Sequence, residues 1–415
     1  MQMQLAINGG LPIRAKKVQA LFHANPMTMQ RAEELLRGGL LSDFYGGPIC
    51  AQFEEAFAAK FEVPFAVAVN SGTAALHCAV AAAKVGPGDE VLVPTACFFT
   101  AASVVIQQRA VPVLVDSVPD SLEIDLECAG QLVTPRTKAI IVAHMYGYPG
   151  RLDEMRHFAD RHDLALIEDV CQAHGARYMD SLAGTVGDLG CFSFAAPRKH
   201  INTGEGGMVI THDEQTARIA RQISNKGKEN GWYTHQIMGY SYCLPEICAL
   251  CGLQGLDELE EEVARRRSAA EEYDAILSGS GLELESLAEG VYHSYFRKIV
   301  RLPEEFAGLR DWIVRAIEAE NVSAKPPHAA LHTIPWLRDH NPFGYGEKVS
   351  GNVVRGSFPR ADNQLTRIID LETGPGLTAE DARVSANAVA KVWGWVQSNR
   401  EQATRFAADA GEYGT

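Results

Sequence analysis

The sequence lacks the features that membrane, secreted and nucleic-acid-binding proteins need. No stretch approaches the ~18 uninterrupted apolar residues of a membrane span, and Met1 to Gly10 has neither the basic nor the apolar segment of a secretory leader. There is no run rich in Lys and Arg, and the formal net charge is -14, which disfavours nucleic acid or an anionic membrane as a partner. We therefore expect a cytoplasmic protein that acts on a small polar molecule.

The nine cysteines form no disulfide or metal pattern. Their number is odd, and they are scattered through apolar segments such as 76–80, as is typical of reduced thiols. Cys248 and Cys251 form a C-x-x-C pair, but neither a second pair nor suitably spaced histidines follow it. A zinc site needs these further ligands. We therefore expect the two cysteines to pack in the core, and we predict no metal site.

What the sequence does contain is an ordinary globular composition with an alternating pattern. Short runs rich in Val and Ile alternate with helical patterns such as 74–84 and 100–107; the runs are 65–69, 90–93, 111–115, 139–143 and 164–167. This alternation predicts an α/β fold, with a mostly parallel sheet and helices on both faces. From about Leu253 a long, charged amphipathic helix is expected to lead into a second domain.

Residues with useful chemistry follow these predicted strands, where open parallel sheets bind their ligands. Gly72 and Thr73 lie in a small-residue turn that feeds a helix. The free N–H groups of such a helix start can receive a phosphate, although a Ser/Thr N-cap is an equally good explanation. Phe98 follows the second run and could lie against a flat ring, or simply fill the core.

A lysine and a carboxylate add a covalent cofactor site to this pattern. Lys199 precedes a Gly-Glu-Gly-Gly run by five residues, and Asp169 follows the run 164–167. A lysine amine condenses with an aldehyde, and a carboxylate at a strand end can hold a protonated ring nitrogen, as pyridoxal phosphate enzymes require. Taken singly, each could be a surface lysine or a structural ion pair. Because all four features occur in order at strand ends, we favour the cofactor site.

Four longer motifs carry a family resemblance. They are residues 70–76, Asn-Ser-Gly-Thr-Ala-Ala-Leu; residues 167–175, Ile-Glu-Asp-Val-Cys-Gln-Ala-His-Gly; residues 187–194, Gly-Asp-Leu-Gly-Cys-Phe-Ser-Phe; and residues 204–209, Gly-Glu-Gly-Gly-Met-Val. The chain resembles the DegT/DnrJ/EryC1/StrS aminotransferases. The resemblance implies fold type I, like aspartate aminotransferase, with a seven-stranded-type sheet and a homodimer. It also implies an N-terminal arm (1–30), a large domain that binds pyridoxal phosphate (31–255) and a smaller C-terminal α/β domain (256–415).

The resemblance also assigns roles to individual residues. Lys199 would bind the cofactor covalently and then move protons at the substrate carbon. Asp169 would keep the ring nitrogen protonated. The other cofactor-binding positions would be Gly72, Thr73 and Ser193 at the phosphate, Phe98 on the ring face and Gln172 near the ring hydroxyl.

Two positions depart from the family pattern. Four residues, 195–198, separate the Phe-Ser-Phe motif from the lysine, where most members have three. Counting forward would thus put Arg198 in its place, but counting back from Gly204 gives Lys199. An arginine stays protonated and cannot form the imine. Ser241 stands where the family usually has an asparagine that reaches the phosphate of the neighbouring subunit, and its shorter side chain leaves that contact open.

The substrate class rests on the resemblance as well. Such enzymes move an amino group from L-glutamine or L-glutamate to a keto-sugar or keto-cyclitol. Residues 5–14 are similar to members that aminate inososes, which favours a keto-cyclitol or a keto-sugar without a nucleotide. A nucleotide-linked keto-sugar stays open, and the loop 325–336 does not decide between them. Two other hypotheses are a sugar dehydratase, suggested by His200 beside the lysine, and a non-catalytic sensor.

Overall fold

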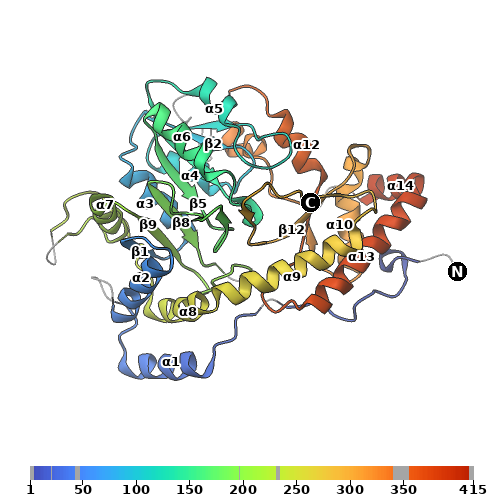
Figure 1. Cartoon of the computed structure of the whole chain (residues 1–415), viewed down its shortest axis with the longest axis horizontal. Helices are drawn as coiled ribbons and strands as arrows, with labels where there is room; N and C mark the ends of the chain where they lie inside the picture. The colour runs from blue at the N-terminus through green and yellow to red at the C-terminus, as the bar shows by residue number, and fades with distance from the viewer. Residues whose placement is uncertain are drawn as a thin grey trace.

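A seven-stranded sheet and a four-stranded sheet organise the protein, and the long helix α9 (Leu259–Leu277) runs beside both (Figure 1). The computed structural model describes residues 4–19, 21–42, 47–195, 197–229, 234–339 and 355–410. Both halves are α/β structures, as expected from the sequence.

The large sheet has the strand order β1-β9-β8-β5-β4-β2-β3. Only β9 runs antiparallel to its neighbours in this sheet, so the predicted mostly parallel sheet is confirmed. The strands are β1 (Phe65–Val69), β2 (Glu90–Pro94), β3 (Val111–Val115), β4 (Thr137–Ala143), β5 (Ala165–Asp169), β8 (Leu189–Ser193) and β9 (Gly207–Thr211).

Helices bury both faces of this sheet because successive side chains of a strand point to opposite sides. In β1, Val67 and Val69 pack in one core, and Ala66 and Ala68 pack in another. Three helices that cover the large sheet contribute to the first core: α3 (Gly72–Ala82), α4 (Thr100–Gln107) and α7 (Glu214–Ser224). The opposite face is covered by α2 (Pro48–Lys60), α5 (Leu126–Leu132), α6 (Leu152–His162) and α8 (Glu246–Asp257).

The smaller sheet belongs to the second half of the chain and has its own core. Its strand order is β10-β12-β14-β13, from β10 (Glu283–Leu284), β12 (Lys298–Arg301), β13 (Ala324–Lys325) and β14 (Ile368–Leu371). Trp312 and Trp393 are buried in this core, on α10 (Arg310–Ala319) and α13 (Ala379–Ser398). The remaining helices of this half are η3 (Glu304–Leu309), η4 (Leu331–Thr333), α11 (Pro335–Arg338), α12 (Pro359–Arg367) and α14 (Arg400–Ala410).

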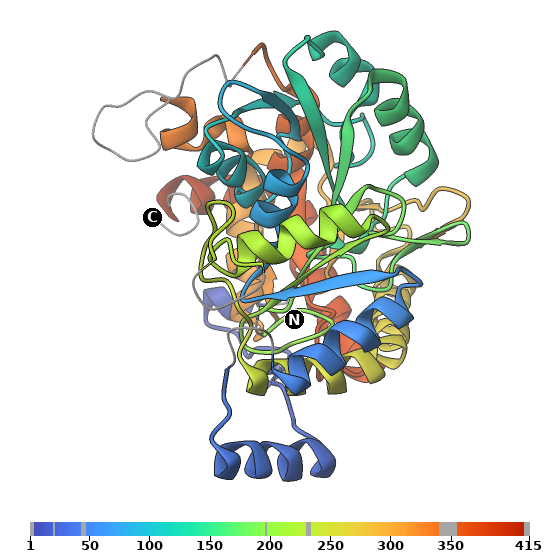
Figure 2. The same cartoon turned by 90° about the vertical axis from the view of Figure 1, so that its left-hand side faces the viewer.

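Two further connections join the halves. A three-stranded sheet pairs β11 (Val291–Tyr292) with β6 (Arg177–Tyr178), which pairs with β7 (Ser181–Leu182). At the N-terminus, Leu5 is buried in the second core just before η1 (Ala6–Asn8). Helix α1 (Pro26–Gly38) then projects away from the body of the molecule (Figure 2).

The charged helix expected from about Leu253 begins later than predicted. Residues up to Asp257 belong to α8, an apolar helix that packs on α2, and α9 starts at Leu259. Three glutamates in the first turn of α9 favour a new helix there because they face its positive dipole end. The division into domains stays a prediction. The predicted boundary, between residues 255 and 256, falls within α8. In the part of the chain that the structure describes, no helix has the length and apolarity to span a bilayer.

Candidate active site

Lys199 lies in the loop that joins β8 to β9. The loop is closed at its base, where the N–H of Phe194 donates to the carbonyl of Gly206 (2.8 Å) and the N–H of Thr203 donates to the carbonyl of Phe194 (3.0 Å). Nζ of Lys199 donates to the carbonyl of Cys171, just beyond the end of β5, and lies 4.8 Å from the centroid of the Phe296 ring. Lys199 therefore reaches back over the carboxyl end of the sheet.

The surroundings of the two neighbouring cations differ. Burial lowers the pKa of Lys199, and the charge of Asp169 partly opposes that shift. Burial also lowers the pKa of Arg198, but its charged neighbours are Arg297 and Asp370 of the four-stranded sheet. Lys199 thus faces the end of β5, while Arg198 faces the other half of the molecule. A lysine with a lowered pKa carries more of the neutral amine that attacks an aldehyde.

Asp169 and Glu168 point to opposite faces of β5. Asp169 is buried, and its Oδ1 accepts from the N–H of Cys171 (3.0 Å). Glu168 is fully buried on the other side, where its carboxylate contacts Nε2 of His144 (2.9 Å) and accepts from the N–H groups of Gly184 (2.7 Å), Val186 (2.9 Å) and Gly187 (2.5 Å). Glu168 is therefore committed to structural hydrogen bonds, and Asp169 is left facing Lys199.

The turn after β1 brings the predicted phosphate-binding residues close together. Ser71 caps α3 by accepting from the N–H of Ala74 (3.1 Å), and Gly72 and Thr73 are the first two helical residues, whose N–H groups have no partner within the helix. A Cβ on Gly72 would lie 2.5 Å from Cβ of Ser193. Glycine is thus required for this close approach, and the structure brings Gly72, Thr73 and Ser193 together. These groups fit the phosphate of pyridoxal phosphate.

The other three predicted cofactor-binding residues are Gln172, Phe98 and Ser241, and their contacts within the chain differ. Oε1 of Gln172 accepts from the N–H of Tyr146 (2.9 Å), so its carbonyl end is already bonded within the chain. Phe98 is 38% exposed, and its ring lies 5.0 Å from that of His328. Ser241 is exposed, and its carbonyl accepts from Nδ2 of Asn70 at 3.4 Å. Asn70 precedes the turn of Gly72, so Ser241 lies near the expected phosphate site of its own chain.

His200 does not take the place of the lysine. Its Nε2 contacts the carbonyl of Ser294 (2.9 Å), and its ring packs near His174 and Phe296. The geometry therefore gives no support to a dehydratase in which histidine replaces Lys199.

Some site residues could not be found from the sequence. Phe296 and His328 come from the second half of the chain, more than ninety residues after Lys199 along the sequence. Tyr146 has a left-handed backbone (φ 59°) that brings its N–H to Gln172. No local motif indicated Phe296 or Tyr146, whereas His328 lies in the loop 325–336, which the sequence singled out without indicating a role. The packing of the two halves brings Phe296 and His328 to the site, and Tyr146 reaches it through its own backbone conformation.

The sheet, the lysine at its carboxyl end and the glycine-lined anion pocket define the class: a fold type I enzyme that uses pyridoxal phosphate. The model of the DegT/DnrJ/EryC1/StrS aminotransferase family matches residues 24–390. The chain belongs to this family and is a pyridoxal phosphate-dependent aminotransferase, which confirms the resemblance seen in its motifs.

Relatives and solved structures agree over most of the chain. The chain is 33% identical to the L-glutamine:2-deoxy-scyllo-inosose aminotransferase of Streptoalloteichus tenebrarius, over 94% of this chain and 98% of the relative. It is 36% identical to the GDP-perosamine synthase of Caulobacter vibrioides, over 70% of this chain and 78% of that protein. The crystal structure of the aminotransferase TlmJ from Streptoalloteichus hindustanus superposes with a TM-score of 0.81 at 28% identity, covering 92% of this chain and all of TlmJ.

We expect Glu168→Gln to lower the free energy of unfolding by roughly 3–5 kcal/mol at neutral pH, because buried donors lose a charged acceptor. Burial opposes ionisation of Glu168, but the bonds from His144 and from backbone N–H groups outweigh it and lower its pKa. The stabilisation is therefore complete above the unfolded-state pKa of about 4.3 and is lost as the pH falls through the lower, folded-state pKa. Urea unfolding across this range should show the difference between variant and wild type shrinking with acid.

Glu154→Gln is the matched control for this experiment. Glu154 forms an exposed pair with Arg151 (3.0 Å), and removing such a pair costs at most about 1 kcal/mol. A Glu168→Gln protein as stable as this control at neutral pH would contradict the assigned role.

Proposed function

We propose that the enzyme transfers an amino group from L-glutamine or L-glutamate to a keto-cyclitol resembling scyllo-inosose, or to a keto-sugar without a nucleotide. The observation that carries this proposal is the match to the inosose aminotransferase, which extends over nearly the whole length of both chains. The product would be an aminocyclitol or amino sugar of the kind used in antibiotic biosynthesis. The proposal places the reaction in the cytoplasm, as expected from the sequence.

Bound pyridoxal phosphate supplies an aldehyde that condenses with amines and a ring that accepts electrons. Lys199 then has two tasks in this proposal: its Nζ holds the cofactor in the resting enzyme, and it later carries the proton that leaves or joins the substrate carbon. Its lowered pKa supports both tasks, because each requires the neutral amine at some stage.

The other predicted residues position the cofactor. Asp169 would hold the proton on the ring nitrogen, and its fixed bond to the N–H of Cys171 orients the carboxylate. Gly72, Thr73 and Ser193 would bind the phosphate. The amide nitrogen of Gln172 would face the ring hydroxyl, since its oxygen is held by Tyr146. Exposed Phe98 would be covered when the ring stacks on it.

A group of cations beside Lys199 supports an anionic substrate group. Arg297 bonds to Asp370, and Lys325 is the register partner of Asp370 in the adjoining strand. Burial is the largest cause of the lowered pKa of Lys325, and the positive charges of Arg198 and Arg297 lower this pKa further. Three cations thus gather around one bonded carboxylate. We propose that they receive the α-carboxylate of the amino donor, and that the extra residue before Lys199 is what brings Arg198 to this place.

The same cations favour a second candidate acceptor, a nucleotide-linked keto-sugar. A diphosphate needs two or more positive groups, and this group provides three. The likeness to GDP-perosamine synthase supports this alternative. The two candidates differ in what Arg198 binds: the donor in the first, the acceptor in the second.

We also propose a homodimer. Helix α1 and the residues after it expose a group of large apolar side chains, namely Met27, Met29, Leu36, Leu40 and Leu41. Exposed apolar patches of this kind mark protein interfaces. In this dimer the side chain of Ser241, which is exposed in the single chain, would lie near the neighbouring subunit.

We expect Asp169→Asn to keep the fold and lose most of the activity. The asparagine oxygen can still accept from the N–H of Cys171, but the neutral side chain cannot hold a proton on the ring nitrogen. Without that proton the ring accepts electrons less readily, so we expect kcat to fall by roughly 100-fold or more, which corresponds to about 2.7 kcal/mol in activation free energy. Asp160→Asn, at an exposed aspartate of α6 paired with Arg156 (2.8 Å), is the matched control and should retain activity. Near-normal kcat in Asp169→Asn would contradict the role.

Substrate assays separate the two acceptor classes. We expect the enzyme to convert its bound cofactor to the amino form with L-glutamine or L-glutamate, and to aminate keto-cyclitols in preference to nucleotide-linked keto-sugars. Arg198→Gln should then raise the KM for the donor and leave the KM for the acceptor unchanged. Arg218→Gln, at an exposed arginine of α7 paired with Glu229 (2.7 Å), is the control. Amination of nucleotide-linked keto-sugars alone, with the acceptor KM raised in Arg198→Gln, would replace the first candidate by the second.

A further inference from the structure

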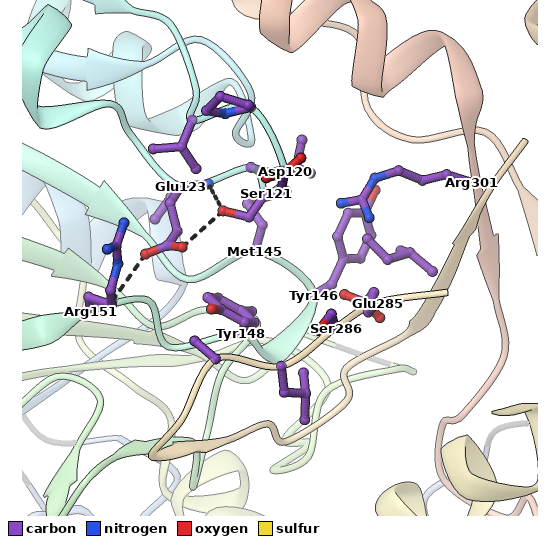
Figure 3. A pocket seen from close by; sticks show the side chains of 17 residues that line it. Asp120, Ser121, Glu123, Met145, Tyr146, Tyr148, Arg151, Glu285, Ser286 and Arg301 are labelled. Atoms are coloured by element: carbon purple, nitrogen blue, oxygen red, sulfur yellow. Dashed lines mark hydrogen bonds between the residues drawn. The ribbon is translucent and has the colours of Figure 1, made fainter. Parts of the chain in front are cut away.

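A second cavity lies between the two halves of the molecule, apart from Lys199. Its volume is about 420 Å³, and its walls come from residues 118–123 after β3, the end of β4, residues 285–288 and β12 (Figure 3). This volume lies within the range of roughly 300–1,000 Å³ that small-molecule sites occupy. Neither Lys199 nor Asp169 lines it.

Tyr146 separates this cavity from the active site. Its side chain lines the cavity, while its backbone N–H donates to Gln172 on the other side (2.9 Å). A left-handed backbone at Tyr146 (φ 59°) is uncommon for a large residue and marks a position fixed by its surroundings. The cavity and the region of Gln172 are therefore adjacent, with Tyr146 between them.

Arg301 brings donors to the cavity that the protein itself does not fully use. Side chains alternate between the two faces of β12, so Arg301 lies on the same face as Ile299, which packs toward the large sheet. The guanidinium is buried, and it points toward Tyr146 (Figure 3). Among the described residues its Nη2 makes a long hydrogen bond to Gln364 (3.4 Å), and its Nε has no partner. A buried group with unused donors is costly unless something else binds it.

Glu285 adds acceptors on the same side of the cavity, close enough to Arg301 for the two charges to interact (Figure 3). Its two ion-pair partners are distant: Nε2 of His293 lies 3.7 Å and Nζ of Lys298 lies 4.0 Å from its carboxylate oxygens. Among the described residues, Oε2 of Glu285 has no hydrogen-bond partner. Despite burial, His293 and Lys298 lower the pKa of Glu285, so it is ionised at neutral pH. The cavity thus holds an unsaturated acceptor as well as an unsaturated donor.

The rest of the wall is polar and pre-ordered. Glu123 accepts from the backbone N–H of Arg151 (3.0 Å) and from Oγ of Ser121 (2.9 Å), a network drawn in Figure 3. Burial raises the pKa of Tyr148 to about 12, so its hydroxyl stays protonated and can donate. The ring of Tyr148 also offers a flat apolar surface.

These features define the ligand by its charge and shape. Three carboxylates (Asp120, Glu123 and Glu285) and two guanidinium groups (Arg151 and Arg301) line the cavity, so neither a phosphate nor a dicarboxylate finds an excess of positive charge. Donors and acceptors on several sides, with tyrosine rings between them, suit a molecule that carries hydroxyl groups around an apolar ring. We propose that this cavity is a second binding site, for a small uncharged cyclic polyol such as a cyclitol or a monosaccharide.

Titration calorimetry on the holoenzyme tests this proposal, with myo-inositol and D-glucose as probes and inorganic phosphate as the anionic comparison. We expect saturable binding of at least one polyol and no binding of phosphate in the cavity. Ser286→Phe fills the cavity from an exposed loop position and should weaken polyol binding by roughly tenfold or more, about 1.4 kcal/mol. The aminotransferase activity of this variant should be unchanged.

Glu289→Phe is the matched control, because Glu289 is exposed on the same loop but does not line the cavity. It should bind the polyol like the wild type, and equal unfolding midpoints of the two variants would show that both are folded. The absence of saturable polyol binding would overturn the proposal. So would polyol binding that persists in Ser286→Phe, or phosphate binding that this variant abolishes. None of these outcomes affects the assignment of Lys199, which is tested by its own chemistry.

Discussion

The alternation of side chains at the end of β5 is the constraint on which the site depends. It turns Glu168 into the sheet interior, where His144 and three backbone N–H groups hold its charge, and it turns Asp169 toward Lys199. A strand shifted by one residue would exchange the two carboxylates. The four bonds of Glu168 therefore help to fix the register that turns Asp169 toward Lys199, the position in which we propose that it acts on the cofactor.

Close packing of the backbone at Gly72 is the second feature on which the site depends. Gly72 approaches Ser193 so closely that a methyl group would not fit between them, which joins the start of α3 to the end of β8. The residues proposed to bind the phosphate, Asp169 and Lys199 thus lie on neighbouring elements of a single sheet. The proposed substrate-binding cations are placed differently, because Arg297 and Lys325 belong to the other half of the chain. In this proposal, cofactor binding and substrate selection are located on separate parts of the fold.

The sequence predicted the first of these parts well and the second poorly. The strand runs, the α/β fold class and the family were all readable from local pattern, since each strand end and its motif are contiguous. The grouping of Arg198 with Arg297 and Lys325 was not readable, because Arg297 and Lys325 follow Arg198 by about a hundred positions or more and meet it only through the packing of two sheets. The start of α9 was placed too early for a related reason: the composition changes near Leu253, but the helix boundary at Glu258 depends on how α8 packs on α2. The roles of the predicted site residues stay predictions.

The identity of the reactive lysine is the claim on which the functional account rests, and chemical trapping tests it directly. Borohydride reduction of the holoenzyme, followed by proteolysis and mass spectrometry, fixes the cofactor to the amine that carries it. The account predicts a phosphopyridoxyl group on the peptide that contains Lys199, and an unmodified Lys325. A modified lysine elsewhere, with an unmodified Lys199, would contradict it.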